Sequence, residues 1–309
     1  MSKQIFIDGS AGTTGLRIRQ RLAGREGIQL IELPEELRKD PDARRQAFQQ
    51  ADAAFLCLPD DAARQAVQLA EGSGCVLLDA STAHRTAPGW VYGMPELGRR
   101  QAICQAKRIA VPGCHASGFI ALVAPLVQAG LLPPEAQLYC CSLTGYSGGG
   151  KSMIAQYEAA DRSPLLDAPR QYGLGQSHKH LPEMAAVTGL DQPPVFSPIV
   201  GDFYSGMEVT VPLFASQLNG GAGMEQVKAL YKEVYAGPVI RYTEAGDESG
   251  FLSAGAYTGR DSMEISVAGN DQRMLLVARY DNLGKGASGA AVQCMNLALG
   301  FEETEGLEL

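Results

Sequence analysis

The chain has 309 residues, 45% of them hydrophobic, with 36 glycines and 17 prolines, a size that favours two domains over one large core. Its net charge of −8, from 26 basic and 34 acidic residues, and the lack of a long basic run exclude a typical nucleic-acid-binding surface. No apolar run approaches the ~20 residues that a membrane-spanning helix needs.

Seven cysteines occur without a Cys-x-x-Cys pair. This usage indicates reduced thiols, and not a disulfide framework or a cysteine metal site. The first residues lead directly into the apolar run Ile5–Ile7, without the basic and apolar regions of a signal peptide. We therefore expect a cytoplasmic protein.

The N-terminal segment has the pattern of a dinucleotide-binding unit. A short buried strand, Gln4–Ile7, is followed by a glycine-rich turn and by helical apolar spacing over Leu16–Leu22. Glycines in this context permit a tight turn and let the backbone approach a pyrophosphate at the helix N-terminus. The spacing is Gly-x-x-Gly-x-x-Gly, not the commoner Gly-x-Gly-x-x-Gly, and a purely structural turn is the alternative. The expected cofactor contacts are Gly9, Ser10, Ala11, Gly12, Thr13, Thr14 and Gly15.

The second predicted strand, Ile28–Leu33, ends where the adenosine ribose of a cofactor would lie. An acidic residue there suits a free 2′-hydroxyl group, and a basic residue suits a 2′-phosphate. Both kinds follow the strand, since Glu35 and Glu36 precede Arg38 and Lys39. The residues alone leave the cofactor type open, and a solvated helix start is an equal alternative.

Helix and strand patterns then alternate over Ala43–Gln50, Ala53–Leu58, Ala62–Ala70 and Cys75–Asp79. This alternation predicts an α/β, doubly wound parallel sheet of the Rossmann type. A polar turn containing Ser81 and Arg85 follows the last strand, at the edge where ligands of such sheets bind. Arg85 is a candidate anion ligand, with a surface ion pair as the alternative.

Cys114 stands where an apolar strand becomes a helix. The run Ile109–Val111 ends at Pro112-Gly113, and a helical segment, Cys114–Gln128, begins at once. The unpaired N–H groups and the positive dipole end of a helix start favour a thiolate, which is the nucleophilic form of cysteine. The alternative is a small buried apolar residue.

A second glycine-rich turn, Gly145–Ser152, follows the predicted strand Ala136–Thr144. It matches the form Gly-x-x-x-x-Gly-Lys-Ser of a mononucleotide phosphate loop. Its place deep in the chain favours a substrate loop instead, with Ser147, Gly148 and Lys151 as candidate contacts.

The rest of the chain predicts an α+β second domain. Proline- and glycine-rich connections come first, and a mixed or antiparallel sheet then follows with a helix at Met224–Tyr235 and a closing helix at Ala290–Leu299. The expected strands are Glu208–Phe214, Val239–Tyr242, Met263–Ala268 and Met274–Tyr280.

His178 and His180 precede a helix start that contains Glu183. A metal site would need further ligands, for which Cys114-His115 is a candidate source, and a structural histidine pair is another alternative. General acid/base catalysis with a cysteine nucleophile fits best. His180, three residues before Glu183, is the expected acid/base, because that spacing brings a helix-start side chain back to a first-turn carboxylate.

Seven motifs in this order resemble the N-acetyl-gamma-glutamyl-phosphate reductase family, in its shorter form. They are Gly9–Gly15, Asp79–Arg85, Tyr92–Leu97, Pro112–Cys114, Gly145–Lys151, His178–Glu183 and Asn282–Gly289. The resemblance spans nearly the whole chain, and the family is similar to aspartate-semialdehyde dehydrogenase. Its segment Ala80–Arg85 departs from the longer members of the family.

The resemblance implies NADPH-dependent reduction of N-acetyl-L-glutamyl 5-phosphate to the 5-semialdehyde through a Cys114 thioester, in arginine biosynthesis. It implies a dinucleotide-binding domain (1–113 and 285–309) to which the C-terminal helix returns, a catalytic and oligomerisation domain (114–284), and a homodimer or homotetramer. Alternatives are a homologous reductase, such as one acting on N-acetyl-aminoadipyl phosphate in lysine biosynthesis, another semialdehyde dehydrogenase, or a non-catalytic nucleotide sensor. The expected residues are catalytic Cys114, His180 and Glu183; cofactor-binding Arg38, Lys39 and Ser81 besides the first glycine turn; and substrate-binding Arg85, Ser147, Gly148, Lys151 and His178, with no metal.

Overall fold

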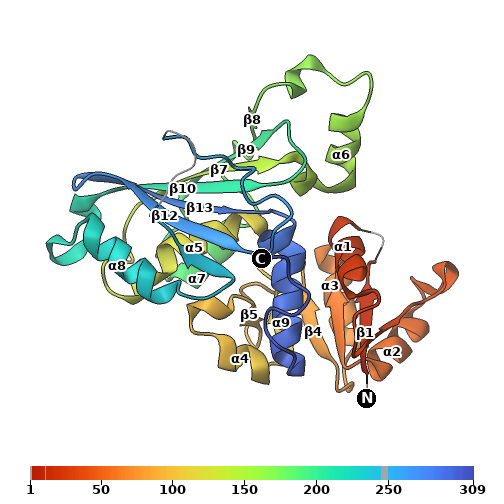
Figure 1. Ribbon diagram of the computed structural model, residues 1–309. Helices are drawn as coiled ribbons and strands as arrows, with labels where there is room; N and C mark the ends of the chain where they lie inside the picture. Colours follow the sequence, from red (N-terminus) through yellow and green to blue (C-terminus); the bar gives the residue numbers. More distant parts are fainter. Residues whose placement is uncertain (1, 11, 245–249) are drawn as a thin grey trace. The chain divides into compact units, whose positions relative to one another are not determined.

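The structure is a computed structural model that describes residues 2–10, 12–244 and 250–309 (Figure 1). The chain divides into two compact units. The first comprises Met1–Pro112 with Ala287–Leu307, and the second comprises Gly113–Gly286 with Glu308–Leu309. Each unit is built around a sheet of its own.

The first unit contains a six-stranded sheet in the order β2-β1-β3-β4-β6-β5, in which every pairing is parallel. Its strands are β1 (Lys3–Asp8), β2 (Ile28–Ile31), β3 (Ala53–Leu56), β4 (Val76–Asp79), β5 (Val91–Tyr92) and β6 (Arg108–Ala110). Its α-helices are α1 (Thr13–Leu22), α2 (Pro41–Gln50), α3 (Asp60–Leu69), α4 (Arg100–Gln105) and α9 (Gly289–Leu299). The predicted doubly wound α/β fold is thus confirmed.

Alternation along the parallel strands sends side chains to two cores, one on each face of the sheet. Ile5 on one face packs with α1 and with α9, whose small residues Ala290 and Ala291 allow a close approach. Phe6 on the other face packs with Phe48 of α2. The C-terminal helix α9 therefore lies in the core of the first unit, against β3 and β4.

The second unit contains a mixed seven-stranded sheet in the order β11-β12-β13-β10-β7-β9-β8. Its strands are β7 (Tyr139–Gly145), β8 (Arg170–Gln171), β9 (Val195–Gly201), β10 (Met207–Phe214), β11 (Ile240–Tyr242), β12 (Met263–Gly269) and β13 (Arg273–Tyr280). Its α-helices are α5 (Cys114–Gln128), α6 (Gly150–Glu158), α7 (Leu181–Thr188) and α8 (Met224–Val234). Helices α5, α7 and α8 lie on one side of the sheet (Figure 1).

Helix α5 is the buried helix of this unit. Every residue from His115 to Leu126 is buried, and the helix packs against β10, β13, α7 and α8. A helix that is apolar all round belongs in a core. Cys114, its first residue, is only partly buried.

Three strands, β5, β8 and β9, were not predicted from the sequence. The segment Val195–Gly201, expected as a proline- and glycine-rich connection, forms β9 between β7 and β8. Pro198 obscures it, because proline has no N–H group for a ladder. The strand tolerates Pro198 because the ladder uses its carbonyl oxygen, which accepts from the N–H of Tyr172 (3.0 Å). A short π-helix at Gly284–Ser288 was also not expected.

A buried ion pair fastens α2 to the carboxyl end of β1. The Nη2 and Nε atoms of Arg44 lie 2.7 and 3.1 Å from Oδ2 of Asp8. The two side chains are 10% and 5% exposed. Burial raises the pKa of Asp8, and the Arg44 guanidinium opposes that rise. The carboxylate is therefore tolerated in the core because of its partner.

We predict that Arg44→Met lowers the free energy of unfolding by about 3–5 kcal/mol, because it leaves the Asp8 charge buried and uncompensated. Arg45→Met is the matched control. Its ion pair with Asp42 is exposed (47% and 81%), so its loss should cost less than ~1 kcal/mol. Urea unfolding at neutral pH measures both values, and similar costs for the two variants would contradict the prediction.

Candidate active site

The first glycine-rich turn is as tight as its backbone allows. Gly9 has φ +91°, and a Cβ on it would lie 2.3 Å from the carbonyl oxygen of Cys57. A Cβ on Gly15 would lie 2.6 Å from the carbonyl oxygen of Gly9. Gly12, by contrast, is exposed and starts α1 as its N-cap. Two of the three glycines are thus required by close packing, and the third leaves the helix start accessible.

The start of α1 suits a pyrophosphate. Its first turn carries no acidic residue, and no side chain caps it. The N–H of Gly12 donates to the carbonyl oxygen of Gly9 (3.1 Å). The donors offered to an anion are therefore the N–H groups of the first turn of α1, which have no partner within the helix. The predicted cofactor contacts Ser10, Thr13 and Thr14 belong to the glycine-rich turn, and the predicted contact Ala11 lies outside the described residues.

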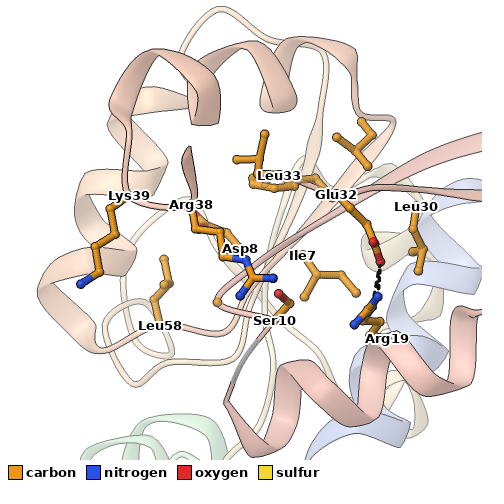
Figure 2. Close-up of a pocket in the computed structure, with 13 residues that line it drawn as sticks. Ile7, Asp8, Ser10, Arg19, Leu30, Glu32, Leu33, Arg38, Lys39 and Leu58 are labelled. Carbon is orange, nitrogen blue, oxygen red and sulfur yellow. Dashed lines mark hydrogen bonds and ion pairs between the residues drawn. The ribbon is translucent and has the colours of Figure 1, made fainter. Parts of the chain in front are cut away.

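A cavity of about 250 Å³ lies beside this turn, at the carboxyl ends of β1 and β2 (Figure 2). Arg38 and Lys39, the predicted cofactor contacts, both line it. Arg38 extends toward Ser10, and Lys39 lies on the far side from Arg19 (Figure 2). The structure thus places both predicted basic residues at one pocket of the first unit.

Three further charged residues of this pocket were not identified from the sequence: Asp8, which is paired with Arg44, and the two residues Arg19 and Glu32. Glu32, just beyond β2, forms an ion pair with Arg19 of α1 at 2.8 Å. An acid at the end of the second strand is the residue that reads a 2′-hydroxyl group, so Glu32 was the better candidate for that role than Glu35. Because Arg19 offsets the charge of Glu32, the pocket remains suited to a 2′-phosphate.

The turn after β4 is organised by a fully buried carboxylate. Asp79 accepts from the N–H (2.9 Å) and the hydroxyl (2.8 Å) of Ser81 and contacts Nδ1 of His84 at 2.6 Å. Trp90 stacks on the His84 ring, with centroids 4.3 Å apart. The bonds to Asp79 therefore hold the side chain of Ser81, a predicted cofactor contact, in one orientation.

Arg85, the predicted substrate contact, is bound to the backbone at two places. Its Nε donates to the carbonyl oxygen of Val111 (3.0 Å), and its Nη2 donates to that of Ala80 (3.2 Å). These bonds fix the guanidinium beside the segment that leads into Gly113.

The start of α5 brings two predicted catalytic residues together. The N–H of Gly113, next to Cys114, donates to Oε2 of Glu183 at 3.2 Å. The backbone of Gly286 approaches from another direction, and a Cβ there would lie 3.1 Å from Cβ of Cys114. Contacts from α7 and from the π-helix segment thus fix the backbone at Cys114.

The three histidines of the second unit form one cluster. His115 is 3% exposed, and its ring centroid lies 5.6 Å from those of both His178 and His180. The N–H of His180 donates to Nδ1 of His178 (3.2 Å). His180 is buried and His178 is partly exposed. The structure therefore brings both predicted histidines to the residue that follows Cys114.

His115 is held by two hydroxyl groups that the sequence did not identify. Its Nδ1 lies 2.6 Å from Oγ of Ser142, and its Nε2 lies 2.6 Å from the hydroxyl of Tyr172. Burial, with a smaller effect of His178, lowers the pKa of His115 to about 3. Burial and the nearby Cys114 raise the pKa of Tyr172. No local pattern in the sequence marks Ser142 or Tyr172, because only the fold brings them to the helix start.

The first three N–H groups of the second glycine-rich turn are already bonded to the backbone of another segment. The N–H groups of Gly145, Tyr146 and Ser147 donate to the carbonyl oxygens of Gly206, Phe203 and Tyr204. A phosphate loop needs such N–H groups for its anion. The buried Ser147 hydroxyl accepts from Nδ2 of Asn282 (3.0 Å).

The predicted substrate contacts of this turn differ in their surroundings. A Cβ on Gly148 would lie 3.6 Å from Nδ2 of Asn282, so Gly148 and Ser147 belong to one cluster. Lys151 is exposed on α6.

Across the described parts of the chain, no group of three His, Cys, Asp or Glu side chains is arranged to hold a metal ion. Within the same residues, no helix is both long and apolar enough to span a membrane.

Comparisons with known proteins agree with this architecture. Residues 4–106 match the family model of the semialdehyde dehydrogenase NAD binding domain, and residues 114–282 match that of the semialdehyde dehydrogenase dimerisation domain. Aspartate semialdehyde dehydrogenase II of Vibrio cholerae, solved in complex with ASA, has a TM-score of 0.72 at 15% identity, covering 97% of this chain and 99% of that one. The enzyme of Candida albicans, solved with NADP, has a TM-score of 0.65 at 16% identity, covering 96% and 98%. The fold is that of the semialdehyde dehydrogenases.

Sequence comparison is more specific. N-acetyl-gamma-glutamyl-phosphate reductases of Brucella ovis and Brucella melitensis are 47% identical to this chain, over 97% of it and 100% of each relative. The chain belongs to the N-acetyl-gamma-glutamyl-phosphate reductase family.

The low pKa of His115 makes stability depend on pH. An unfolded histidine titrates near 6.5, so between about pH 6.5 and 3 the unfolded chain binds a proton that the folded chain does not. The contribution of His115 to stability is therefore fully present above pH 6.5, and it falls by up to about 1.4 kcal/mol per pH unit below that value. We predict that His115→Gln flattens the fall in the free energy of unfolding between pH 6.5 and 5. Chemical unfolding at several pH values measures this, and unchanged slopes would contradict it.

Proposed function

We propose that this chain reduces N-acetyl-L-glutamyl 5-phosphate to N-acetyl-L-glutamate 5-semialdehyde with NADPH, releasing phosphate, as a step of arginine biosynthesis. The observation that carries the proposal is Cys114 at the start of α5, in a chain 47% identical over nearly its whole length to reductases of this name. The name of these relatives, at 47% identity, favours the shorter substrate.

The proposed cofactor is NADP(H), held by the first glycine turn and the cavity beside it. The tight Gly9 and Gly15 backbone, the acid-free start of α1 and the two basic side chains Arg38 and Lys39 support this. Ser10, Thr13, Thr14 and Ser81 are proposed as further contacts. When bound, NADPH supplies the hydride for the reduction.

In the proposed mechanism the Cys114 thiolate attacks the acyl carbon of the substrate. A C–S bond forms, the bond from that carbon to the phosphate oxygen breaks, and phosphate leaves with the bonding electrons. The positive end of the α5 dipole stabilises the thiolate, and N–H groups at the same helix start stabilise the oxyanion of the intermediate. Arg85, Ser147, Gly148, Lys151 and His178 are the proposed substrate contacts.

Reduction of the resulting thioester gives a thiohemiacetal on Cys114. We assign His180 the proton that this species gains and then returns as the C–S bond breaks and the aldehyde leaves. The position of His180 supports this, because it is the N-cap residue of α7, three residues before Glu183, whose carboxylate binds the Gly113 N–H. His115, with a pKa of about 3, is neutral at working pH and is not the donor.

We further propose that residues 1–113 with 285–309 form the dinucleotide-binding domain and that residues 114–284 form the catalytic and oligomerisation domain. A homodimer or homotetramer is supported by the open face of the seven-stranded sheet. There Tyr139 pairs with Val195 and Pro212 pairs with Leu275, and Tyr139, Val195 and Leu275 are 41%, 60% and 44% exposed. A cytoplasmic location is supported by the seven cysteines, none of which forms a disulfide in the described structure.

The function is tested with purified protein, NADP⁺ and phosphate, by comparing N-acetylglutamate 5-semialdehyde with N-acetyl-aminoadipate semialdehyde. We predict turnover of the first, and abolition of that turnover in Cys114→Ala with NADPH affinity nearly intact. Cys104→Ser, which removes an exposed cysteine of α4, is the control and should keep full activity. Substrate should protect Cys114 from alkylation, and Cys75, whose pKa burial raises to about 12, should react slowly. Substantial activity in Cys114→Ala would overturn the nucleophile assignment.

Cofactor choice gives a second prediction. Replacing both Arg38 and Lys39 with alanine should raise the KM for NADPH by about 10²- to 10⁴-fold, because each charged bond to a phosphate contributes ~1.5–3 kcal/mol and about 1.4 kcal/mol corresponds to a tenfold change. The KM for NADH should change little. Arg45→Ala with Arg64→Ala removes two exposed charges from α2 and α3 and is the control. Equal effects on the two cofactors would show that Arg38 and Lys39 do not read the 2′-phosphate.

The two histidines give a third prediction. His180→Asn should lower kcat by about 10²–10⁴-fold, as expected for a general acid/base, and should remove one limb of the pH–rate profile. His178→Asn should act mainly on the KM of the substrate. Steady-state kinetics across pH separates these effects. A larger loss of kcat in His178→Asn, with an unchanged profile in His180→Asn, would reverse the two roles.

A further inference from the structure

The hydroxyl of Tyr280, a residue of β13, lies at the first turn of α5. It donates to the carbonyl oxygen of Cys114 (2.5 Å) and accepts from the N–H of Gly118 (3.0 Å). In a continuous α-helix these two groups, from residues i and i+4, pair with each other. The tyrosine is fully buried. One hydroxyl from the sheet thus bonds to both ends of the helix turn that begins with the proposed nucleophile.

Gly118 provides the space for this hydroxyl. A Cβ at position 118 would lie 2.8 Å from the Tyr280 oxygen and 2.7 Å from Cγ2 of Val209. Glycine weakens the interior of a helix, so its presence there calls for a packing reason. The hydrogen bonds of the Tyr280 hydroxyl and the glycine at position 118 are two observations of the same arrangement, in which the tyrosine enters the first turn of α5.

Two other tyrosine hydroxyls also donate to carbonyl oxygens of α5. Tyr235 donates to Ala121 (2.6 Å), and Tyr231 donates to Leu122. Both tyrosines are buried and come from the segment of α8. These bonds anchor the middle of the same helix, about two turns after Cys114. Comparing these bonds with those of Tyr280 distinguishes the effect of anchoring the helix from the effect of holding its first turn.

We propose that Tyr280, with Gly118, is a positioning residue for Cys114. Its hydroxyl donates a hydrogen bond to the carbonyl oxygen of Cys114 and so prevents fraying of the first turn. The N–H groups and the dipole of α5 therefore stay directed at the Cys114 thiolate. A displacement of about 1 Å at a reacting atom can cost about 10²-fold in rate. The inference rests on the proposed function, because it gives Tyr280 its role through the Cys114 nucleophile.

The test compares Tyr280→Phe with Tyr235→Phe. Both remove one hydroxyl and one hydrogen bond to α5, so both should lower the Tm. Tyr280→Phe should lower kcat by about 10- to 100-fold, leave the KM for NADPH unchanged, and move the midpoint of Cys114 alkylation by iodoacetamide to higher pH. Tyr235→Phe should keep the kcat and the alkylation midpoint of the unaltered protein.

Gly118→Ala is the second variant, because its methyl group displaces the hydroxyl while the tyrosine remains. It should reproduce the loss of kcat and the alkylation shift. Folded Tyr280→Phe or Gly118→Ala protein with unaltered kcat and midpoint would overturn the proposal, as would equal losses of kcat in the two tyrosine variants. Activity in Cys114→Ala would overturn the proposed mechanism itself. An inactive Cys114→Ala together with a fully active Tyr280→Phe would overturn only the role of Tyr280.

Discussion

The second unit depends on one constraint at the start of α5: the helix is buried, but its first residue must be accessible. A buried helix start leaves backbone groups without partners inside the helix. Here the N–H of Gly113 bonds to Glu183, its carbonyl oxygen accepts from Ser117, and the carbonyl of Cys114 accepts from Tyr280. The partners come from α7, from α5 itself and from β13. Cys114 can stay partly exposed because its backbone is held on all these sides.

The part that His115 plays in the histidine cluster follows from its place between two hydroxyl groups. His115 is enclosed by Ser142 and Tyr172 and stays neutral, because desolvation disfavours a charge there. A neutral imidazole between two hydroxyl groups orients its neighbours and does not exchange protons at working pH. In the proposed mechanism, proton transfer is assigned to one of the two histidines whose rings lie against that of His115, and we assign it to His180. The residue next to the proposed nucleophile in sequence thus supports the site without taking part in that transfer.

Most of the first unit could be predicted from sequence, because its β/α alternation is local and its strands are apolar throughout. The strand β9 of the second unit could not be predicted, because Pro198 interrupts the strand pattern and the pairing with β7 joins residues far apart in the sequence. The same limit applies at the site. Cys114 and the two histidines stand in recognisable motifs, whereas Tyr280 and Tyr172 reach the helix start only through the folded sheet. Gly118 was the one sequence signal of that arrangement, as a glycine inside a helical pattern.

The two glycine-rich turns show why a pattern of residues does not decide function. Both follow a strand and precede a helix. In the first, close contacts at Gly9 and Gly15 tighten the turn while the start of α1 carries no competing acid or cap. In the second, the N–H groups of Gly145, Tyr146 and Ser147 are already bonded to residues 203–206. An anion can be bound only by donors that the fold has left open. The bonds of Gly145, Tyr146 and Ser147 therefore distinguish the first part of the second turn from a phosphate loop, whereas the start of α6, like that of α1, has no acidic residue and no side-chain cap.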